Sequence, residues 1–258
     1  IIIVIIIIIT AFFASLLTLF SGFGLGTLLM PIIAIFFPIA VAIAITALVH
    51  LMNNLFKLIT LWRDIHWQVG LQFGVPALLS AIPGAWLLAR LAHFDNITNY
   101  MIFNIEASIT PIKIIIGSLL IIFAAAEFLS IAKKTTFTQQ YLVIGGMLSG
   151  FFGGLSGHQG AFRSAFLLRT TLDAKQFIAT NALIASLVDI TRLIVYGINV
   201  NLLFQEVSIG LIIAATLAAF SGVLVGKMGI KKITISVIQK IVTFMLFILG
   251  ILILVGIL

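Results

Sequence analysis

The chain has no cysteine and very little charge for its length. Without cysteine it can form no disulfide framework, no thiolate metal site and no cysteine nucleophile. Its 258 residues include only 7 Asp and Glu and 14 Lys and Arg, too few to cover the outside of a water-soluble protein. With 62% hydrophobic residues and a mean hydropathy of +1.33, the composition indicates a protein whose solvent is the lipid bilayer.

The basic residues are arranged as in a membrane protein. They lie between apolar runs and form no stripe with interleaved aromatic residues, so no nucleic-acid partner is predicted. The first apolar run, residues 1–19, is long enough to span a bilayer and lacks the charged start and the cleavage site of a secretory signal. We therefore treat this run as part of the fold. His50, His66 and His93 are not spaced like metal ligands, so neither a metal nor another cofactor is predicted.

Apolar runs separated by breakers predict an all-α polytopic membrane protein. The expected segments are residues 1–20, 25–37, 39–62, 67–91, 111–131, 140–155, 160–170, 176–197, 202–226 and 233–257. Segments 25–37 and 160–170 are too short to cross a hydrocarbon core of about 30 Å comfortably. Each follows a glycine-rich break, which predicts a re-entrant-like helix pair followed by three transmembrane helices.

The chain contains an internal repeat. A shift of 135 positions places Gly22 on Gly157 and Lys57 on Arg192, and it also aligns Thr46 with Asn181 and Asn54 with Asp189. The expected repeats are residues 1–132 and residues 138–258, within a single membrane domain. Each has five elements, an odd number, so the second repeat enters the membrane from the opposite side and the repeats are predicted to be inverted.

Loop charges predict the orientation of the chain. One group of loops has only Asp64 and Asp173 as acidic residues, and its basic residues are Arg63, Lys133, Lys134, Arg169, Lys175, Lys227, Lys231 and Lys232. The other loops are more balanced, with Arg90, Lys113, Asp95, Glu106 and Glu206. By the positive-inside rule the first group is cytoplasmic, which places both termini outside an inner (plasma) membrane.

The second break, "GGLSGHQGAFRSAFLLR" at residues 153–169, carries polar residues in an apolar setting. A helix can be interrupted inside a membrane only where protein or a water-filled cavity provides hydrogen-bond partners for the exposed backbone N–H and C=O groups. The helix that restarts at Gly160 points free N–H groups and its positive dipole end into that cavity, which favours an anion. Arg163, one turn further on, offers a planar fork to an oxyanion. The alternative is that Arg163 caps a neighbouring helix or extends to the membrane surface.

The first break, "FSGFGLGTLLMP" at residues 20–31, has the glycines but few polar side chains. Its expected chemistry is that of the backbone, and the alternative is that Gly22 and Gly26 serve close helix packing.

Asp189 and Arg192, three residues apart, are expected to pair with each other in a structural role. The candidate substrate-binding residues are Ser21, Gly22, Gly24, Gly26, Thr27, Thr46, Ser156, Gly157, His158, Gln159, Gly160, Arg163 and Asn181.

The two breaks, "SGFGLGTLLMP" and "GGLSGHQGAFRSAFL", resemble those of the sulfite exporter TauE/SafE family of membrane permeases. The resemblance covers essentially the whole chain, including the duplicated halves and the connection between them. It implies a non-enzymatic permease that exports sulfite, a related sulfur oxyanion or an organosulfonate. The second break departs from the plainer Gly-Gly version common in the family, since it carries His158, Gln159 and Arg163, and this departure points to a substrate subgroup.

Other functions remain as alternatives. Gly154 to Gly157 match the G-x-S-G pattern of rhomboid-like intramembrane serine proteases, with Ser156 as the nucleophile, but that chemistry needs a histidine from another helix. A cation permease would require a buried carboxylate at the break, and a structural subunit would leave Arg163 unexplained. His158 titrates near neutral pH when unperturbed, so protons are a possible coupling ion. A homodimer is left open by the sequence.

The predicted orientation is testable by cysteine labelling, because the natural chain has no cysteine. Lys133→Cys should react with a membrane-impermeant maleimide supplied at the cytoplasmic side, and Asp95→Cys should react only from the outside. The measurement is the fraction labelled in intact cells and in inverted vesicles. Labelling of both positions from the same side would contradict the topology.

Overall fold

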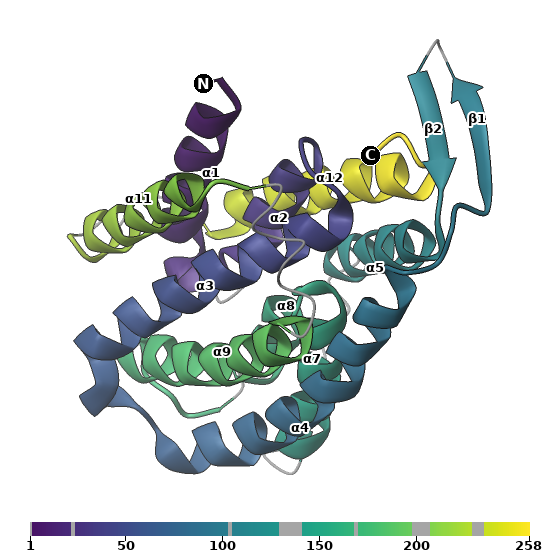
Figure 1. Cartoon of the computed structure of the whole chain (residues 1–258). Helices are drawn as coiled ribbons and strands as arrows, with labels where there is room; N and C mark the ends of the chain where they lie inside the picture. Colours follow the sequence, from purple (N-terminus) through teal and green to yellow (C-terminus); the bar gives the residue numbers. More distant parts are fainter. Residues whose placement is uncertain are drawn as a thin grey trace.

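The computed structural model describes residues 2–21, 24–102, 105–128, 141–167, 170–197, 207–228 and 235–258 (Figure 1). Its helices are α1 (Ile2–Ser21), α2 (Gly26–Ala34), α3 (Ile39–Leu61), the 3₁₀ helix η1 (Trp62–Asp64), α4 (Trp67–Leu91), α5 (Pro111–Phe128), α7 (Leu142–Ser156), α8 (Gly160–Leu167), α9 (Ala174–Gly197), α11 (Ile209–Lys227) and α12 (Ile235–Leu254). Several residues of the orientation argument lie outside the described residues, namely Lys133, Lys134, Arg169, Glu206, Lys231 and Lys232.

Helices make up the membrane part of the molecule, as the composition predicts. Among the described residues, α1, α3, α4, α9 and α11 contain the stretches that are long and apolar enough to cross a membrane. An apolar run in lipid must satisfy its backbone N–H and C=O groups within the segment, and the α-helix does so. The chain is therefore a multi-pass membrane protein whose apolar segments are α-helical.

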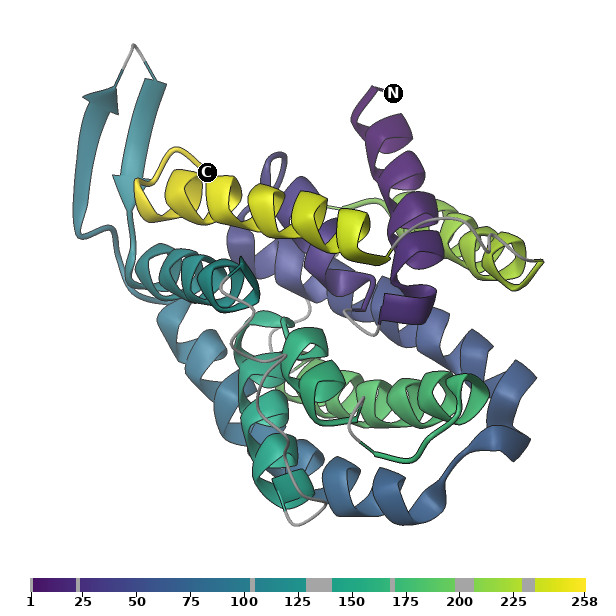
Figure 2. The ribbon, with the colours of Figure 1, turned by 180° about the vertical axis from the view of Figure 1, so that it is seen from behind.

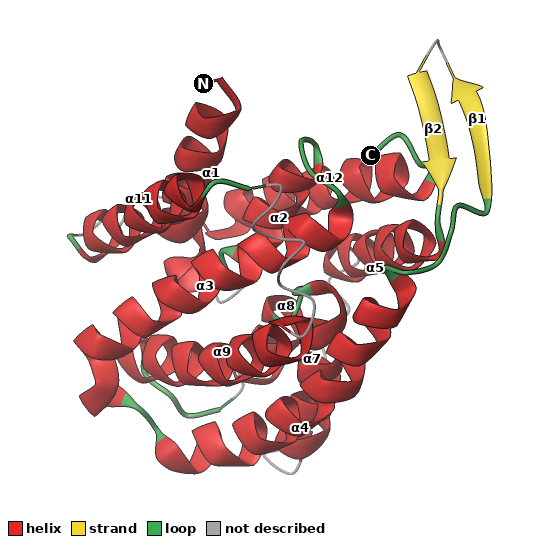
Figure 3. Cartoon of the chain, in the orientation of Figure 1, coloured by secondary structure: helices red, strands yellow, loops and turns green. Residues whose placement is uncertain are grey.

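A β-hairpin is the one element that the sequence analysis did not predict. Strands β1 (Thr98–Ile102) and β2 (Ile105–Ile109) pair antiparallel in a region expected to be loop. Figure 3 shows the hairpin projecting away from the helices, near the C-terminus. The backbone N–H of Ser108 donates to the carbonyl of Gly256 at 3.0 Å, and the Tyr100 hydroxyl donates to the carbonyl of Val255. These bonds fix the hairpin to the C-terminal end of the chain.

Helices far apart in sequence pack against one another in pairs. α4 lies along α7, α1 along α11, α5 along α12, and α3 along α9 (Figures 1 and 2). Small residues allow the close approach: a Cβ added at Gly150 of α7 would collide with the carbonyl of Ala77, and one added at Gly222 of α11 would collide with the carbonyl of Phe12. Such contacts replace the hydrophobic effect, which does not drive helix association within lipid.

The centre of the molecule is formed by α3 and α9, which are the most buried of the long apolar helices. Two short helices accompany them. α2 begins at Gly26, after α1 has ended at Ser21, and α8 begins at Gly160, after α7 has ended at Ser156. Both end earlier than the expected segments 25–37 and 160–170. The inverted relation between the halves stays a prediction.

The α4–α7 contact generates a stability prediction. Gly150→Ala should lower the free energy of unfolding by about 1–3 kcal/mol, because the new methyl group has no room against the α4 backbone. Gly210→Ala is the matched control, since a Cβ at Gly210 meets nothing within 4 Å. Thermal unfolding midpoints of the purified proteins in detergent provide the measurement. Equal midpoints for the two variants would refute the packing described here.

Candidate functional site

The second break is a tight turn between α7 and α8. Gly157 ends α7 in the left-handed conformation, with φ of 79°, and its N–H donates to the carbonyl of Gly153 at 2.9 Å. Glycine adopts this conformation without the steric cost that other residues bear. The Ser149 hydroxyl donates to the carbonyl of Gln159 at 3.1 Å, which holds the end of the turn against α7. Gly160 then starts α8.

The first break has a similar turn. Gly24 has φ of 85°, and the Thr27 hydroxyl donates to its carbonyl at 2.8 Å. Gly26 begins α2 directly afterwards. Gly22 and the side chain of Ser21, both predicted to belong to the site, lie outside what the structure describes. The described half of this break therefore offers backbone groups and a threonine whose hydroxyl proton is already used.

The two breaks contact each other. A Cβ placed on Gly26 would lie 3.7 Å from the carbonyl oxygen of Gly157 and 3.4 Å from Cγ2 of Thr46. A Cβ placed on Gly24 would lie 3.0 Å from Nε2 of His50 and 3.9 Å from Nη2 of Arg163. Glycines at these positions thus leave room for side chains of α3 and α8.

Arg163 is buried at this junction with part of its guanidinium free. Its side chain is 1% exposed, so it does not extend to the surface, which was one form of the alternative interpretation. Its Nε donates to Oδ1 of Asn181 on α9, while its Nη1 has no hydrogen-bond partner in the described structure. A buried N–H donor without a partner is costly. The arrangement leaves an unused donor one turn into α8.

Arg192 pairs with Asp189, as the sequence predicted, but it also lies against the second break. Its Nη2 is 2.8 Å from Oδ1 of Asp189. The N–H groups are not aligned with that oxygen, and Nε, Nη1 and Nη2 have no hydrogen-bond partner within the described residues. A Cβ on Gly157 would lie 2.5 Å from Nη1 of Arg192. The second arginine thus packs directly on the turn, a contact that the sequence analysis did not predict.

Asp189 contacts several buried polar side chains, and we call this group of residues the central cluster. Besides Arg192, its carboxylate contacts Nδ1 of His50 at 2.6 Å and accepts a hydrogen bond from Nε2 of Gln159 at 3.3 Å. Asn54 lies 3.2 Å from Nε2 of His50. The carboxylate therefore joins α3, α9 and the second break in one network.

Besides the predicted Thr46, α3 contributes polar residues that the sequence analysis left out of the site. His50, Asn53, Asn54 and Lys57 are all buried, and they stand at the i, i+3, i+4 and i+7 positions of an otherwise apolar helix. This spacing puts them on one face. A polar stripe on a membrane helix is a functional signal in itself, and it was present in the sequence.

The buried charges do not balance. Within the part of the chain that the structure describes, the buried Arg and Lys side chains are Lys57, Arg163 and Arg192, and the buried carboxylate is that of Asp189. Lys57 forms no ion pair there. Excess cationic charge in a low-dielectric environment is expensive unless an anion compensates it. The cluster has the composition of an anion site.

The remaining predicted donors differ in availability. The Ser156 hydroxyl donates to the carbonyl of Phe152 at 3.0 Å, and the amide of Gln159 is bound to the shared carboxylate. His158 places Nδ1 3.0 Å from the carbonyl oxygen of Ser156, while its Nε2 has no described partner. Thr46 has an unpartnered hydroxyl oxygen. Thr46 and His158 can therefore still bond to a ligand.

The protease alternative lacks its geometry in the described structure. A serine nucleophile needs a histidine nitrogen at its hydroxyl. The ring nitrogen of His158 contacts the carbonyl of Ser156 instead, and the other buried histidine, His50, is held by Asp189. These contacts leave Ser156 without a general base.

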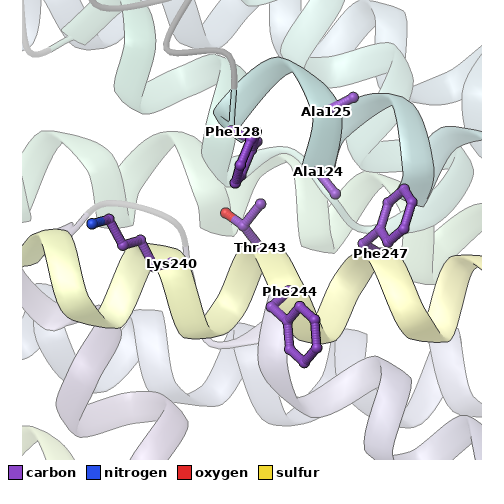
Figure 4. Close-up of a pocket in the computed structure, with 7 residues that line it drawn as sticks. All are labelled: Ala124, Ala125, Phe128, Lys240, Thr243, Phe244 and Phe247. Carbon is purple, nitrogen blue, oxygen red and sulfur yellow. The ribbon is translucent and has the colours of Figure 1, made fainter.

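A separate hollow lies between α5 and α12 (Figure 4). It is lined mainly by apolar side chains and contains none of the predicted site residues; its lining is Ala124, Ala125, Phe128, Lys240, Thr243, Phe244 and Phe247. The polar centre of the molecule lies instead at the meeting point of the two breaks.

Comparison with known proteins agrees with the resemblance of the two breaks. The model of the family described as sulfite exporter TauE/SafE matches residues 7–253, which include both breaks and the central helices α3 and α9. No curated protein matches the chain. TauE/SafE is a family of transporters and not of enzymes. Because the match extends over nearly the whole sequence, the chain belongs to the sulfite exporter TauE/SafE family.

Proposed function

We propose that this protein is a permease of the inner (plasma) membrane that exports sulfite or a related sulfur oxyanion or organosulfonate. The anion is held where the two glycine breaks meet, and alternating access exposes it to each side in turn. Family membership supports transport of a sulfur anion. The choice of anion and the mechanism rest on the chemistry of the central cluster.

The observation that carries the proposal is the unpartnered Nη1 of the Arg163 guanidinium near the start of α8. The side chain is buried, and Nη1 has no described partner. Helix N-termini present N–H groups and a positive dipole end. A sulfur oxyanion has several acceptor oxygens, so it can bond to the planar fork and to the helix end together. The hydroxyl of Thr46 supplies a further donor.

The charge balance favours an anion over a cation. The described buried side chains include three Arg and Lys cations and one carboxylate, and that carboxylate, Asp189, is already engaged by His50 and Arg192. A cation would have to displace these partners and would meet further positive charge. An anion gains from the same arrangement.

We further propose that residues 1–132 and 138–258 form inverted repeats, and the packing pairs support this. If α1 corresponds to α7 and α4 to α11, the α4–α7 pair has the α1–α11 pair as its counterpart. The central pair α3–α9 and the pair α5–α12 each join corresponding elements. Rocking of one repeat against the other around a fixed central site is a general route to alternating access.

Export requires no additional energy-converting domain in this proposal. Both termini are placed outside and the basic loops inside, as the loop charges predict. A cell that is negative inside makes outward movement of an anion favourable, by about 2.3 kcal/mol per charge for 100 mV. The membrane potential therefore favours export of any species that crosses with net negative charge, such as the sulfite dianion alone or with one proton.

Removing the Arg163 side chain tests the proposal. Arg163→Ala should weaken sulfite binding by roughly 10- to 100-fold, because a hydrogen bond to a charged group is worth about 1.5–3 kcal/mol. Arg163→Lys keeps the charge but loses the fork, so an intermediate affinity is expected. Calorimetric titration of the purified, folded proteins provides the measurement.

The matched control is Arg90→Ala. Arg90 is exposed at the end of α4, where its guanidinium lies over the ring of Trp86, so its loss should leave sulfite affinity unchanged. Flux in proteoliposomes against a panel of anions and cations complements the titration. Unchanged sulfite affinity in Arg163→Ala, or a preference for cations, would reject the proposal.

A further inference from the structure

His50 lies against the first break and is linked to the second break through Asp189. Its Nε2 lies against Gly24 of the first break, where a Cβ would approach it to 3.0 Å. Its Nδ1 lies 2.6 Å from Oδ2 of Asp189, whose other oxygen accepts from Gln159 of the second break. The imidazole is 2% exposed and the carboxylate is fully buried. A change of charge on this ring therefore alters the electrostatic environment of both breaks.

His50 is buried among charged groups of both signs. α1 and α2 carry no titratable side chain in their described residues, and α11 has only Lys227, at its last turn. The exposed turn η1 holds Arg63 and Asp64. The buried groups are Asp189 and Arg192 of α9, Arg163 of α8, Lys57 of α3 itself and His158 of the second break. Burial disfavours the imidazolium, Asp189 favours it, and the positive charges of Arg192 and Arg163 disfavour it.

An anion bound among these cations shifts that balance toward the imidazolium. Its negative charge offsets the repulsion from Arg163 and Arg192, so the protonated ring becomes more favourable once the anion is present. By thermodynamic linkage the converse holds equally, and a protonated ring binds the anion more tightly. The two ligands therefore bind cooperatively at one centre.

We propose that His50, held by Asp189, is the proton-binding site of this permease and takes up a proton together with the anion. The neutral ring donates from Nδ1 to Asp189, and the incoming proton adds to Nε2, which faces the first break. The imidazolium remains paired with the carboxylate, and the proton leaves when the anion leaves. This inference rests on the proposed anion transport and adds a coupling ion to it.

His158 is less suited to this role, although the sequence suggested it. Its Nδ1 is directed to the backbone carbonyl of Ser156, and no described carboxylate bonds to its ring. An imidazolium in a buried site needs an anionic partner. Asp189 supplies one to His50 and not to His158, which leaves His158 neutral, with Nδ1 donating to the carbonyl of Ser156 and Nε2 as an acceptor.

Calorimetric measurement of proton uptake tests the assignment. Sulfite is titrated into the protein at one pH in Bis-Tris and in Tris, which differ in ionisation enthalpy and are not anions that compete for the site. The difference between the two binding enthalpies gives the protons taken up per sulfite bound. The titration of sulfite itself is common to all variants, so differences between variants report on the protein.

His50→Gln should take up fewer protons per sulfite than the natural protein, by as much as one, and Asp189→Asn should show a similar loss. His158→Gln is the matched control and should retain the uptake. Proton uptake in His50→Gln equal to that of the natural protein would overturn the assignment while leaving anion binding in place. Absence of sulfite binding by the natural protein would instead overturn the proposed function and this inference with it.

A second measurement needs no variant, in case His50→Gln does not fold. At zero membrane potential and constant external pH, proteoliposomes of the natural protein should take up sulfite at a higher initial rate when the internal pH is higher. The initial rate in protein-free liposomes, which reports diffusion of the uncharged acid, is subtracted. A protein-dependent initial rate that does not change with internal pH would overturn coupling at any residue.

Discussion

An excess of buried positive charge is the constraint on which the rest of this structure depends. Lys57, Arg163 and Arg192 lie in the centre of an apolar molecule with Asp189 as the described buried carboxylate. Lipid cannot solvate these groups, and a protein interior tolerates them only with partners. Asp189 serves both His50 and Arg192, which leaves capacity for one further anion. A transported sulfur anion would supply the negative charge that balances these cations.

Glycine makes the central cluster sterically possible. The left-handed turns at Gly24 and Gly157 bring the ends of the short helices toward α3 and α9, and the absence of a Cβ at Gly157 makes room for the guanidinium of Arg192. The same residue type lets α7 lie close to α4. Helices gain little from hydrophobic association within lipid, so close backbone contacts stabilise this protein. The interruptions of its helices form the candidate site.

Much of the fold follows from local sequence, whereas the site depends on distant contacts. The long apolar runs and the breaks at Gly157 and Gly24 are encoded within single segments, so they were predictable. The Asp189–Arg192 pair was predictable because it lies on one face of one helix. The contact of His50 with Asp189 spans 139 positions, and no local pattern reveals it. The hairpin at 98–109 was missed because the search was for membrane spans, although its tie to the C-terminus is again a distant contact.

A direct location of the bound anion tests the central claim most sharply. Selenite has the shape and charge of sulfite and carries an anomalous scatterer, so crystals grown with selenite will reveal its position. The account predicts an anomalous peak between the guanidinium groups of Arg163 and Arg192, within hydrogen-bond distance, about 3 Å, of their nitrogens. A peak confined to exposed lysines such as Lys175, with the centre empty at saturating selenite, would contradict it.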